Sequence, residues 1–420
     1  MSSRAISTNR RRLLQFLAAS PLAAPALREA WGAEPVASFT RWPDPVIWAP
    51  FDPTLIIQSP AEASNAFDFE PACREAVPPA HFGYMTGGVE DGASMRDNRE
   101  GFQEFQLLPR RLNDVSKLDM KVELFGTTWG SPVYACPVGG CMAYHPEGER
   151  AVSTAARTGN HMQMLSTFAN TSIEEAIEAR GAPVVFQLYA RWGYEVAKEM
   201  CMRAEAAGST AVAVTIDRVA GRVMEAQERL ERVDDRTCTD CHDRSSSQAA
   251  NIRKVHVAEL NFAAVGRARE PFALTWDVMR RLRDETKMKF LVKGVMTAAD
   301  ATLCVENGFD GLVVSNHGGR AENSGLSTIE ALSEIVPAVK GKIPVLVDSG
   351  FRRGSDVVKA LAMGAAAVGI GRPYLWGLGA FGQEGVERVL EIVHAETRTV
   401  MAQCGAASVK QLTPAHVRHI

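Results

Sequence analysis

The sequence predicts an α/β protein, a (β/α)8 TIM barrel, because short apolar segments of strand type alternate with segments of helix type. Eight apolar segments follow one another, at residues 132–137, 162–167, 184–189, 211–217, 290–294, 311–316, 343–350 and 366–373. Helix-type segments lie between them at residues 172–180, 195–207, 298–307, 327–339 and 354–363. Continuously apolar strands belong to a parallel sheet covered on both faces, and eight such units close a barrel. A doubly wound sheet would need a Gly-rich turn after its first strand, and none is present.

The polar residues at the ends of these segments predict where the site lies. They are Gln187, Tyr189, Thr215, Asp217, Lys293, Ser315, His317 and Asp348. The carboxyl ends of barrel strands meet at one face, which is where barrel enzymes carry their sites. We therefore expect these side chains to surround a single pocket.

The chain begins with a segment unlike the rest. Asn9 is followed by three arginines, Arg10 to Arg12, and then by an apolar stretch rich in small residues at 16–27. This pattern is typical of a twin-arginine export signal at residues 1–33, and a basic N-terminus followed by a helix is the alternative. The signal predicts a periplasmic protein. It also suits a cofactor enzyme, because the twin-arginine route carries chains that have already folded.

The remainder of the chain predicts one catalytic domain. Residues 34–120 form an N-terminal extension with helices, and residues 121–420 form the barrel. After the fourth strand, a loop at 222–275 is too long for an ordinary connection and is interpreted as a lid or insert. Cys136, Cys201 and Cys304 lie in apolar stretches, so we expect them to be buried as small hydrophobic side chains.

Composition and charge argue against two kinds of partner. The 420 residues carry 46 basic and 49 acidic side chains, and the net charge of -3 leaves no positive excess to hold nucleic acid. After the signal, no segment has the roughly 18 uninterrupted apolar residues that a membrane span needs.

Two turns rich in glycine and arginine predict a phosphate site. Residues 348–354 read Asp-Ser-Gly-Phe-Arg-Arg-Gly before a helix, and residues 369–373 read Gly-Ile-Gly-Arg-Pro after the eighth strand. Backbone amides at helix starts and arginines after strands seven and eight make the usual phosphate pocket of a barrel. Tight turns with surface arginines would explain either stretch alone.

A histidine and an arginine follow the sixth strand in the run Ser315-Asn316-His317-Gly318-Gly319-Arg320. Two glycines leave room for a substrate beside the imidazole, and a guanidinium can bind a carboxylate through two hydrogen bonds. The pair predicts a general base next to an anion site.

Together these motifs resemble the FMN-dependent 2-hydroxy-acid dehydrogenase and oxidase family, which includes glycolate oxidase, lactate oxidase and mandelate dehydrogenase. The similarity spans residues 82–420 and includes the segments 145–149, 186–189, 214–217, 291–294, 315–320, 348–354 and 370–373. It implies an FMN cofactor, a 2-hydroxy-acid substrate that becomes the 2-oxo acid, and a homo-oligomer.

The resemblance also implies roles for the catalytic side chains. His317 takes a proton from the substrate, Asp217 stabilises the resulting imidazolium, and Tyr189 donates to the substrate oxygen. Lys293 lies near the flavin N1–C2 edge and raises the flavin potential. Arg320 completes the set. A structural ion pair between Lys293 and Asp217 at the barrel mouth is the alternative.

The same resemblance assigns the cofactor contacts. The isoalloxazine ring would be held by Ser166, Gln187 and Thr215, with Lys293, Ser315, Asp348 and Gly350 also at the cofactor. The FMN phosphate would be held by Arg352, Arg353, Gly371 and Arg372.

The sequence departs from the family in the ligands for the substrate carboxylate. Gly83 falls where the family has the first tyrosine of a Tyr-Tyr pair, and Gly221-Arg222-Val223 stands where it has Gly-Arg-Arg. We therefore expect a substrate bulkier than glycolate or lactate, or one without an α-carboxylate. Arg218 or Arg222 would compensate if the shortened turn brings either one to the site.

A second departure is the motif Cys238-Thr239-Asp240-Cys241-His242 in the long loop. Cys-x-x-Cys-His is the attachment pattern of c-type haem. A disulfide between Cys238 and Cys241, and a metal site completed by His256, are the alternatives.

We therefore expect a periplasmic FMN-dependent enzyme that passes electrons to a cytochrome or quinone, with oxygen as an alternative acceptor. A non-carboxylate alcohol is the alternative substrate. The competing functions are a flavin-binding protein with a decayed site, and a barrel lyase or isomerase in which Lys293 forms a Schiff base.

Overall fold

The computed structural model describes residues 56–236, 255–258 and 273–420, and all of these belong to one compact unit. The predicted export signal at 1–33 and the Cys238, Cys241 and His242 motif lie outside the described residues. No helix in the described part of the chain is long and apolar enough to cross a membrane.

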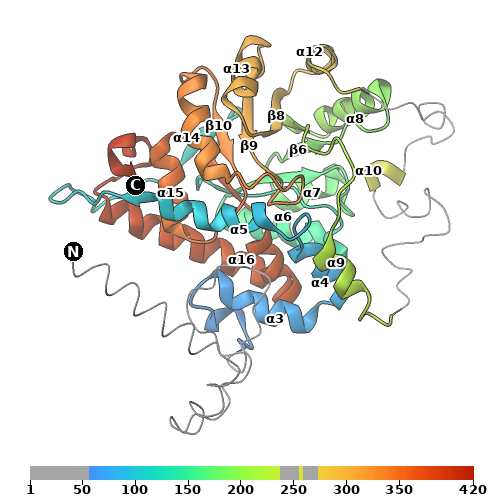
Figure 1. Ribbon diagram of the computed structural model, residues 1–420, viewed down its shortest axis with the longest axis horizontal. Coiled ribbons are helices and arrows are strands. Elements are labelled where there is room, and N and C mark those ends of the chain that lie inside the picture. Colours follow the sequence, from blue (N-terminus) through green and yellow to red (C-terminus); the bar gives the residue numbers. More distant parts are fainter. Residues whose placement is uncertain (1–55, 237–254, 259–272) are drawn as a thin grey trace, which may run out of the picture. The chain divides into compact units, whose positions relative to one another are not determined.

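A closed barrel of eight parallel strands lies at the centre of the molecule (Figure 1), so the predicted (β/α)8 fold is confirmed. Its strands in chain order are β4 (Val133–Ala135), β5 (Met162–Ser166), β6 (Val185–Leu188), β7 (Ala211–Thr215), β8 (Lys289–Val295), β9 (Gly311–Val314), β10 (Val345–Val347) and β11 (Ala367–Ile370). The last strand β11 pairs with the first strand β4 and closes the ring. Several predicted segments extend past the carboxyl ends of these strands, because the residues there leave the ladder and form the site.

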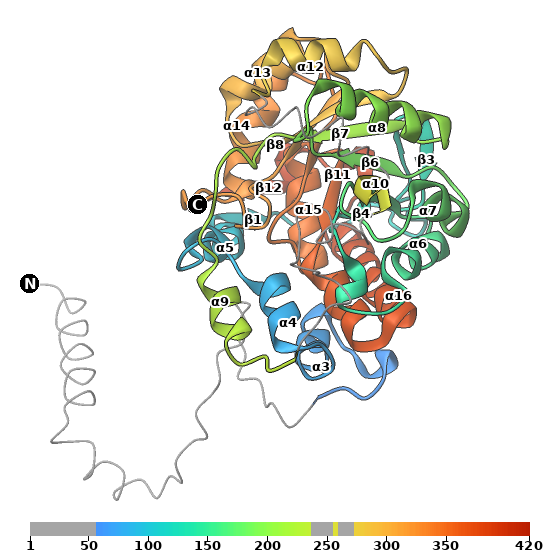
Figure 2. The same ribbon diagram turned by 90° about the vertical axis from the view of Figure 1, so that its right-hand side faces the viewer.

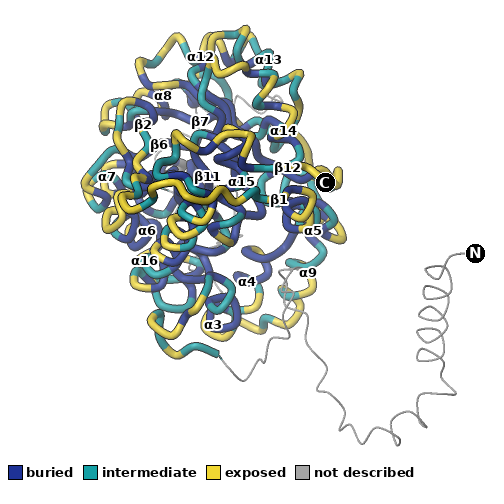
Figure 3. The backbone as a smooth tube through the Cα atoms, turned by 90° about the vertical axis from the view of Figure 1, so that its left-hand side faces the viewer, coloured by how far each residue is buried: buried dark blue, intermediate teal, exposed yellow. Residues whose placement is uncertain are grey.

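Helices surround the barrel, and five of them lie at the predicted positions. They are α6 (Gly148–Thr158), α7 (Ile173–Arg180), α8 (Tyr194–Ala206), α12 (Trp276–Arg283), α13 (Ala298–Glu306), α14 (Thr328–Val339), α15 (Gly354–Met363) and α16 (Arg372–Gln403). Ser172 and Ser327 begin α7 and α14 with capping boxes, which satisfy backbone N–H groups at the helix starts. Figure 3 shows the buried barrel interior enclosed by partly exposed helices. Cys136, Cys201 and Cys304 are buried, as expected.

The N-terminal extension packs directly against the barrel. It contains α3 (Phe69–Ala76), α4 (Pro79–Thr86), α5 (Ala93–Glu100) and β1 (Phe105–Leu107), and the hairpin of β2 (Val122–Leu124) and β3 (Thr127–Trp129) follows it. Strand β1 pairs antiparallel with β12 (Val417–His419) at the chain's end, and α3 packs along α16. The extension therefore supports the barrel and does not form a core of its own.

The first part of the long loop docks on this extension. Helix α9 (Glu225–Glu231) packs against α4, and the two helices lie side by side in Figures 1 and 2. A Cβ atom at Gly83 would lie 2.9 Å from the Cβ of Leu230, so this close packing requires a glycine. The backbone N–H of Ala80 donates to the Asp234 carboxylate at 3.0 Å. The described start of the predicted insert is thus held in place over α4.

Candidate active site

A cavity of about 1320 Å³ opens at the carboxyl ends of the barrel strands. Ligand pockets usually measure about 300–1,000 Å³, so this one has room for a large cofactor and a small substrate together. Its wall includes Gln187, Tyr189, Thr215, Lys293, His317 and Asp348. The expectation that the polar residues past the strand ends surround a single pocket is confirmed for these six side chains.

His317 is held between an acid and a phenol. Its Nδ1 lies 3.0 and 3.1 Å from the two carboxylate oxygens of Asp217, and its Nε2 lies 3.2 Å from the Tyr189 hydroxyl. Because a carboxylate only accepts hydrogen bonds, Nδ1 carries the proton and the lone pair of Nε2 faces the cavity. A proton acceptor at Nε2 is what a general base needs.

The backbone around His317 is shaped for this position. His317 has φ of +60°, a left-handed conformation that is uncommon for a residue other than glycine. A Cβ atom at Gly294 would lie 2.8 Å from the Cβ of Asp217, so only a glycine lets the carboxylate approach. Backbone strain of this kind concentrates at active sites.

Burial and the neighbouring charges keep the imidazole of His317 neutral, so it can accept a proton. Burial lowers the pKa of His317 below its ordinary value, and the negative charge of Asp217 opposes that effect only in part. Burial disfavours ionised Asp217, but His317 and Lys293 outweigh it and lower the pKa of the carboxyl. Burial raises the pKa of Tyr189, so its hydroxyl keeps its proton. At neutral pH the set is a neutral imidazole, a carboxylate and a phenol donor.

Lys293 forms a compensated cluster with Asp348 and Ser315. The Lys293 Nζ lies 3.0 Å from an Asp348 carboxylate oxygen, and the two side chains are only 5% and 6% exposed. Nζ also donates to the Ser315 hydroxyl at 2.8 Å, and that hydroxyl donates to Asp348 at 2.6 Å. Burial disfavours the ammonium, but Asp348 and Asp217 outweigh it and raise the pKa of Lys293.

This cluster weighs against two alternatives. Lys293 pairs with Asp348, and no ion pair joins it to Asp217 in the described part of the chain. A Schiff base requires a neutral amine, and the raised pKa keeps Lys293 charged. A fixed cation at this place can instead stabilise negative charge on a bound ring.

The other side chains expected to contact the ring lie in register across neighbouring strands. Ser166 on β5 stands opposite Gln187 on β6, and Thr215 on β7 stands opposite Lys293 on β8. The Gln187 side-chain amide donates to the Thr215 hydroxyl at 2.8 Å. A row of donors and acceptors along one wall, with a cation at its end, matches the polar edge of an isoalloxazine ring.

Arginines and a helix start form another part of the cavity wall. Gly350, Arg352, Gly371 and Arg372 line it, and Gly371 is the N-cap of the long helix α16. The Arg372 guanidinium donates to the carbonyl groups of Gly318 at 2.9 Å and Gly87 at 3.0 Å. Two guanidinium groups at a helix N-terminus suit a phosphate. The residues present therefore fit FMN along its whole length.

Arg353 does not belong to this part of the cavity wall. Its guanidinium forms an ion pair with Glu396, with 2.8 Å between Nη2 and Oε1, and it does not line the cavity. The expectation that it holds the phosphate stays a prediction, and this structure gives its guanidinium a different partner. Arg353 is the N-cap of α15, and its side chain pairs with Glu396 of α16.

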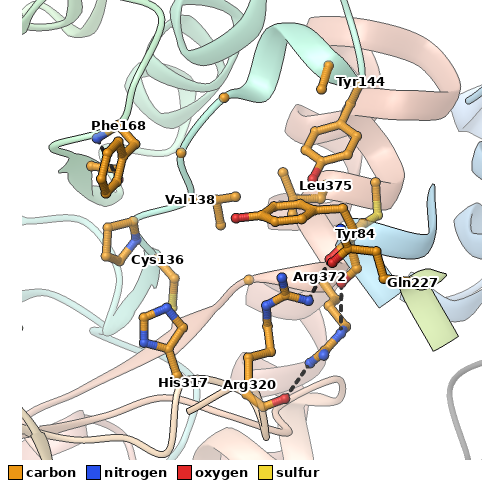
Figure 4. A pocket seen from close by; sticks show the side chains of 18 of the residues that line it. Tyr84, Cys136, Val138, Tyr144, Phe168, Gln227, His317, Arg320, Arg372 and Leu375 are labelled. Carbon is orange, nitrogen blue, oxygen red and sulfur yellow. Dashed lines mark hydrogen bonds between the residues drawn. The ribbon is translucent and has the colours of Figure 1, made fainter. Parts of the chain in front are cut away.

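The substrate side of the cavity is built from α4 and the loops after β7 and β9, and Figure 4 shows Tyr84 of α4 close to Arg320. The Arg320 guanidinium lies 4.7 Å from the centre of the Tyr84 ring and donates to the Gly87 carbonyl at 2.8 Å. Its Nη2 is buried and has no hydrogen-bond partner among the described residues. An unsatisfied buried guanidinium nitrogen indicates a place for an anionic ligand.

A tyrosine and a second arginine line the substrate side, although the sequence departs from the family at these positions. Tyr84 lines the cavity, whereas Gly83 faces Leu230 of α9. Arg222 also lines the cavity, and one of its nitrogens donates to the Arg320 carbonyl oxygen. Burial, together with the nearby charges of Arg320 and Arg218, lowers the pKa of Arg222 to about 10. Val223 instead is half exposed.

The helical periodicity of the sequence contains information about Tyr84 that the motifs did not show. On a helix, residues i, i+1, i+4 and i+5 share a face, and Ala80, His81, Tyr84 and Met85 all line the cavity. Gly83 lies on another face of α4. Helical periodicity across 79–86 would therefore have identified Tyr84 as the tyrosine of the site. The cavity wall also includes Tyr144 and Phe168, which no motif indicated.

Known proteins with similar sequences agree with this chemistry. A family model described as FMN-dependent dehydrogenase matches residues 73–419. A peroxisomal (S)-2-hydroxy-acid oxidase of Oryza sativa subsp. japonica is 38% identical over 360 residues, which cover 84% of this chain and 95% of the oxidase. An L-lactate oxidase of Lysinibacillus sphaericus is 36% identical, with 82% of this chain and 90% of the oxidase covered.

Solved structures agree as well. A soluble mutant of the membrane-associated (S)-mandelate dehydrogenase from Pseudomonas putida matches with a TM-score of 0.76 and 32% identity, covering 85% of this chain and 99% of the other. A mandelate oxidase with (S)-2-phenylpropionate matches with a TM-score of 0.74 and 32% identity, covering 85% of this chain and 98% of the other.

Proposed function

Because the chain belongs to the FMN-dependent dehydrogenase family and is an FMN-dependent 2-hydroxy-acid oxidase or dehydrogenase, we propose specific roles for its residues. The substrate's α-carboxylate binds to Arg320, Arg222 and Tyr84, and His317 removes a proton from the carbon or hydroxyl being oxidised. The single observation that carries this is His317, whose Nδ1 is held by Asp217 and whose Nε2 faces the cavity beside Tyr189. Bound FMN supplies the two-electron acceptor.

Each neighbour of His317 has a defined part in this step. Tyr189 donates its hydroxyl hydrogen to the substrate oxygen, and its raised pKa keeps that hydrogen in place. Asp217 stabilises the imidazolium once Nε2 has taken the proton. Lys293 provides a fixed positive charge at the ring wall.

The test is anaerobic reduction of the purified yellow protein by a series of 2-hydroxy acids, followed by flavin absorbance. We expect rapid bleaching by at least one acid, and release of FMN when the protein is precipitated with acid. Glycolate and lactate belong in the series, because the reason to expect them to be poor substrates disappears with Tyr84 and Arg222 in the cavity. A protein that keeps its yellow colour with every acid would be the flavin-binding protein with a decayed site.

We further propose that the enzyme is exported to the periplasm and delivers electrons to a cytochrome or quinone. The support is the run Arg10 to Arg12 before an apolar stretch. The relatives that are named oxidases favour oxygen instead. Stopped-flow reoxidation with air and with anaerobic cytochrome c compares the two acceptors, and cell fractionation with a signal-deletion control tests export.

Two smaller proposals accompany this one. Covalent haem at Cys238, Cys241 and His242 predicts a haem-stained band on a denaturing gel that disappears in a Cys238→Ser and Cys241→Ser double variant. A disulfide or a metal at the same motif gives no such band. The proposed homo-oligomer is tested by light scattering of the purified protein.

A further inference from the structure

Three guanidinium groups line the substrate side of the cavity. Arg218 follows Asp217 directly at the carboxyl end of β7, Arg222 lies farther along the same loop, and Arg320 follows β9. Arg222 is tied to Arg320 because it donates to the Arg320 carbonyl oxygen. Arg218 and Arg320 both lower the pKa of Arg222, which places three positive charges close together.

No acidic side chain in the described part of the chain forms an ion pair with these three arginines. The two buried carboxylates of the cavity are engaged elsewhere, since Asp217 accepts from His317 and Asp348 pairs with Lys293. At the cavity mouth, Asp234 pairs with Arg236 at 2.7 Å. The buried Nη2 of Arg320 has no hydrogen-bond partner among the described residues. The positive charge of the three arginines is therefore not neutralised by a carboxylate of the described residues.

The net charge of these side chains indicates the charge of the ligand that they would bind. On the substrate side, Arg218, Arg222 and Arg320 carry three positive charges, and Asp217 with neutral His317 carries one negative charge. Lys293 and Asp348 cancel each other, and Arg352 and Arg372 are assigned to the FMN phosphate and are not counted here. Glu228, Glu231, Arg191 and Arg232 are exposed and also line the cavity, and their four charges sum to zero. Partly buried charges without partners are costly, so a ligand that neutralises an excess of two positive charges is favoured.

We infer that the substrate is a 2-hydroxy dicarboxylate, whose α-carboxylate lies at Arg320 and Arg222 and whose second carboxylate lies at Arg218. This inference rests on the proposed function, since it requires the α-carboxylate to bind at Arg320. Arg218 is half-buried and lies near both Tyr189 and Asp217, because its charge acts on each of them. A carboxylate at Arg218 would thus lie on the same side as the reacting hydroxyl.

The experiment compares pairs of substrates that differ in one charged group. Anaerobic stopped-flow gives the efficiency of flavin reduction with malate against 2-hydroxybutyrate, and with 2-hydroxyglutarate against 2-hydroxypentanoate, using both enantiomers of each. Mandelate tests an aromatic side chain. We expect the preferred dicarboxylate to exceed its monocarboxylate partner by about ten- to a hundredfold, the effect of one charge-assisted contact.

Variants of Arg218 assign the preference to this residue. Arg218→Gln should reduce the ratio of dicarboxylate to monocarboxylate efficiency to about one, and Arg218→Lys should keep an intermediate ratio because it keeps the charge. Arg110→Gln is the matched control, since Arg110 is exposed and does not line the cavity; its ratio should equal that of the wild type. FMN content and melting temperature show that each variant has folded.

The outcomes separate this inference from the proposed function. Fast flavin reduction by a monocarboxylate or by mandelate, without any gain from a second carboxylate, overturns the inference and leaves the proposed function standing. An equal loss for both substrate types in Arg218→Gln also overturns it. If no 2-hydroxy acid reduces the flavin, the proposed function and the inference both fail.

Discussion

Lys293 and the three arginines of the substrate side line one cavity, but among the described residues only Lys293 has a carboxylate partner. Lys293 is buried and is neutralised by Asp348 at 3.0 Å, with Ser315 bridging the two. Arg218, Arg222 and Arg320 line the same cavity without a paired carboxylate in the described part of the chain. The lysine is compensated in charge without a ligand, and the substrate-side arginines are neutralised only when an anion binds.

This difference follows from what each part of the cavity must do. A cofactor stays bound through many turnovers, so the lysine beside it needs a fixed partner that preserves its charge and position. A substrate binds and leaves in each cycle, and arginines without a protein partner give their interaction energy to the incoming carboxylate. A permanent carboxylate among them would compete with the substrate.

The largest effect should come from the general base of the cavity. His317→Gln should lower the rate of flavin reduction by about 10²–10⁴-fold, the usual contribution of a positioned base, while FMN content stays the same. His419→Gln, at an exposed histidine outside the cavity, is the control. Anaerobic stopped-flow measures both. A His317→Gln protein that reduces its flavin at the wild-type rate would show that another group is the base.

Lys293→Met removes the cation of the Lys293–Asp348 ion pair. It leaves the Asp348 carboxylate buried without its cation, which should lower the free energy of unfolding by about 3–5 kcal/mol. The double variant Lys293→Met/Asp348→Asn removes the unpaired charge and should recover part of that loss. Urea unfolding of the three proteins, each checked for FMN content, measures the effect. Equal stability of the single and double variants would contradict a coupled pair.

A change at one of the three arginines should affect activity and leave the free energy of unfolding nearly unchanged. Arg222→Met removes a partly desolvated cation without leaving a carboxylate unpaired, so we expect little or no loss in the free energy of unfolding. The same change should lower kcat/KM by about 10–100-fold, because a charge-assisted hydrogen bond to the substrate is lost. A large destabilisation with unchanged kcat/KM would mean that Arg222 is structural.

The pH profile of kcat/KM reports the protonation of free His317. Burial places the pKa of His317 below its ordinary value of 6.5, and the base acts only when the imidazole is neutral. Activity should therefore persist as the pH falls through 6.5 and decline only at lower pH, where Nε2 becomes protonated. Assays from pH 4.5 to 8 with the flavin content monitored would give the acid limb. A limb at or above pH 6.5 would contradict this environment.

The smallest effect is expected at Arg353. Its ion pair with Glu396 is on the surface, and such pairs contribute about 0–1 kcal/mol. Arg353→Gln should leave the FMN dissociation constant unchanged, whereas Arg372→Gln should weaken FMN binding strongly. Fluorescence titration of each apoprotein with FMN compares the two. Equal weakening of FMN binding in the two variants would indicate that Arg353 contacts the phosphate.

The sequence by itself determined the barrel and the centre of the site. Continuous apolar strands predict a buried parallel sheet, and the carboxyl ends of its strands converge, so the order of residues along the chain is enough to group Lys293, His317 and Asp348. His317, Asp217 and the two glycine-rich turns are each defined by residues close to one strand end. Such residues are identified by local patterns alone.

Only the tertiary structure decided which residues line the substrate side and which of the neighbouring arginines lines the cavity. Tyr84 reaches the cavity because α4 is rotated to press Gly83 against Leu230 of α9, and that contact joins segments about 150 positions apart. Arg353 leaves the cavity because α15 begins at that point and Glu396 of α16 attracts its guanidinium. The rotation of a helix and the choice between neighbouring side chains depend on what packs against them, and spacing along the sequence does not carry that information.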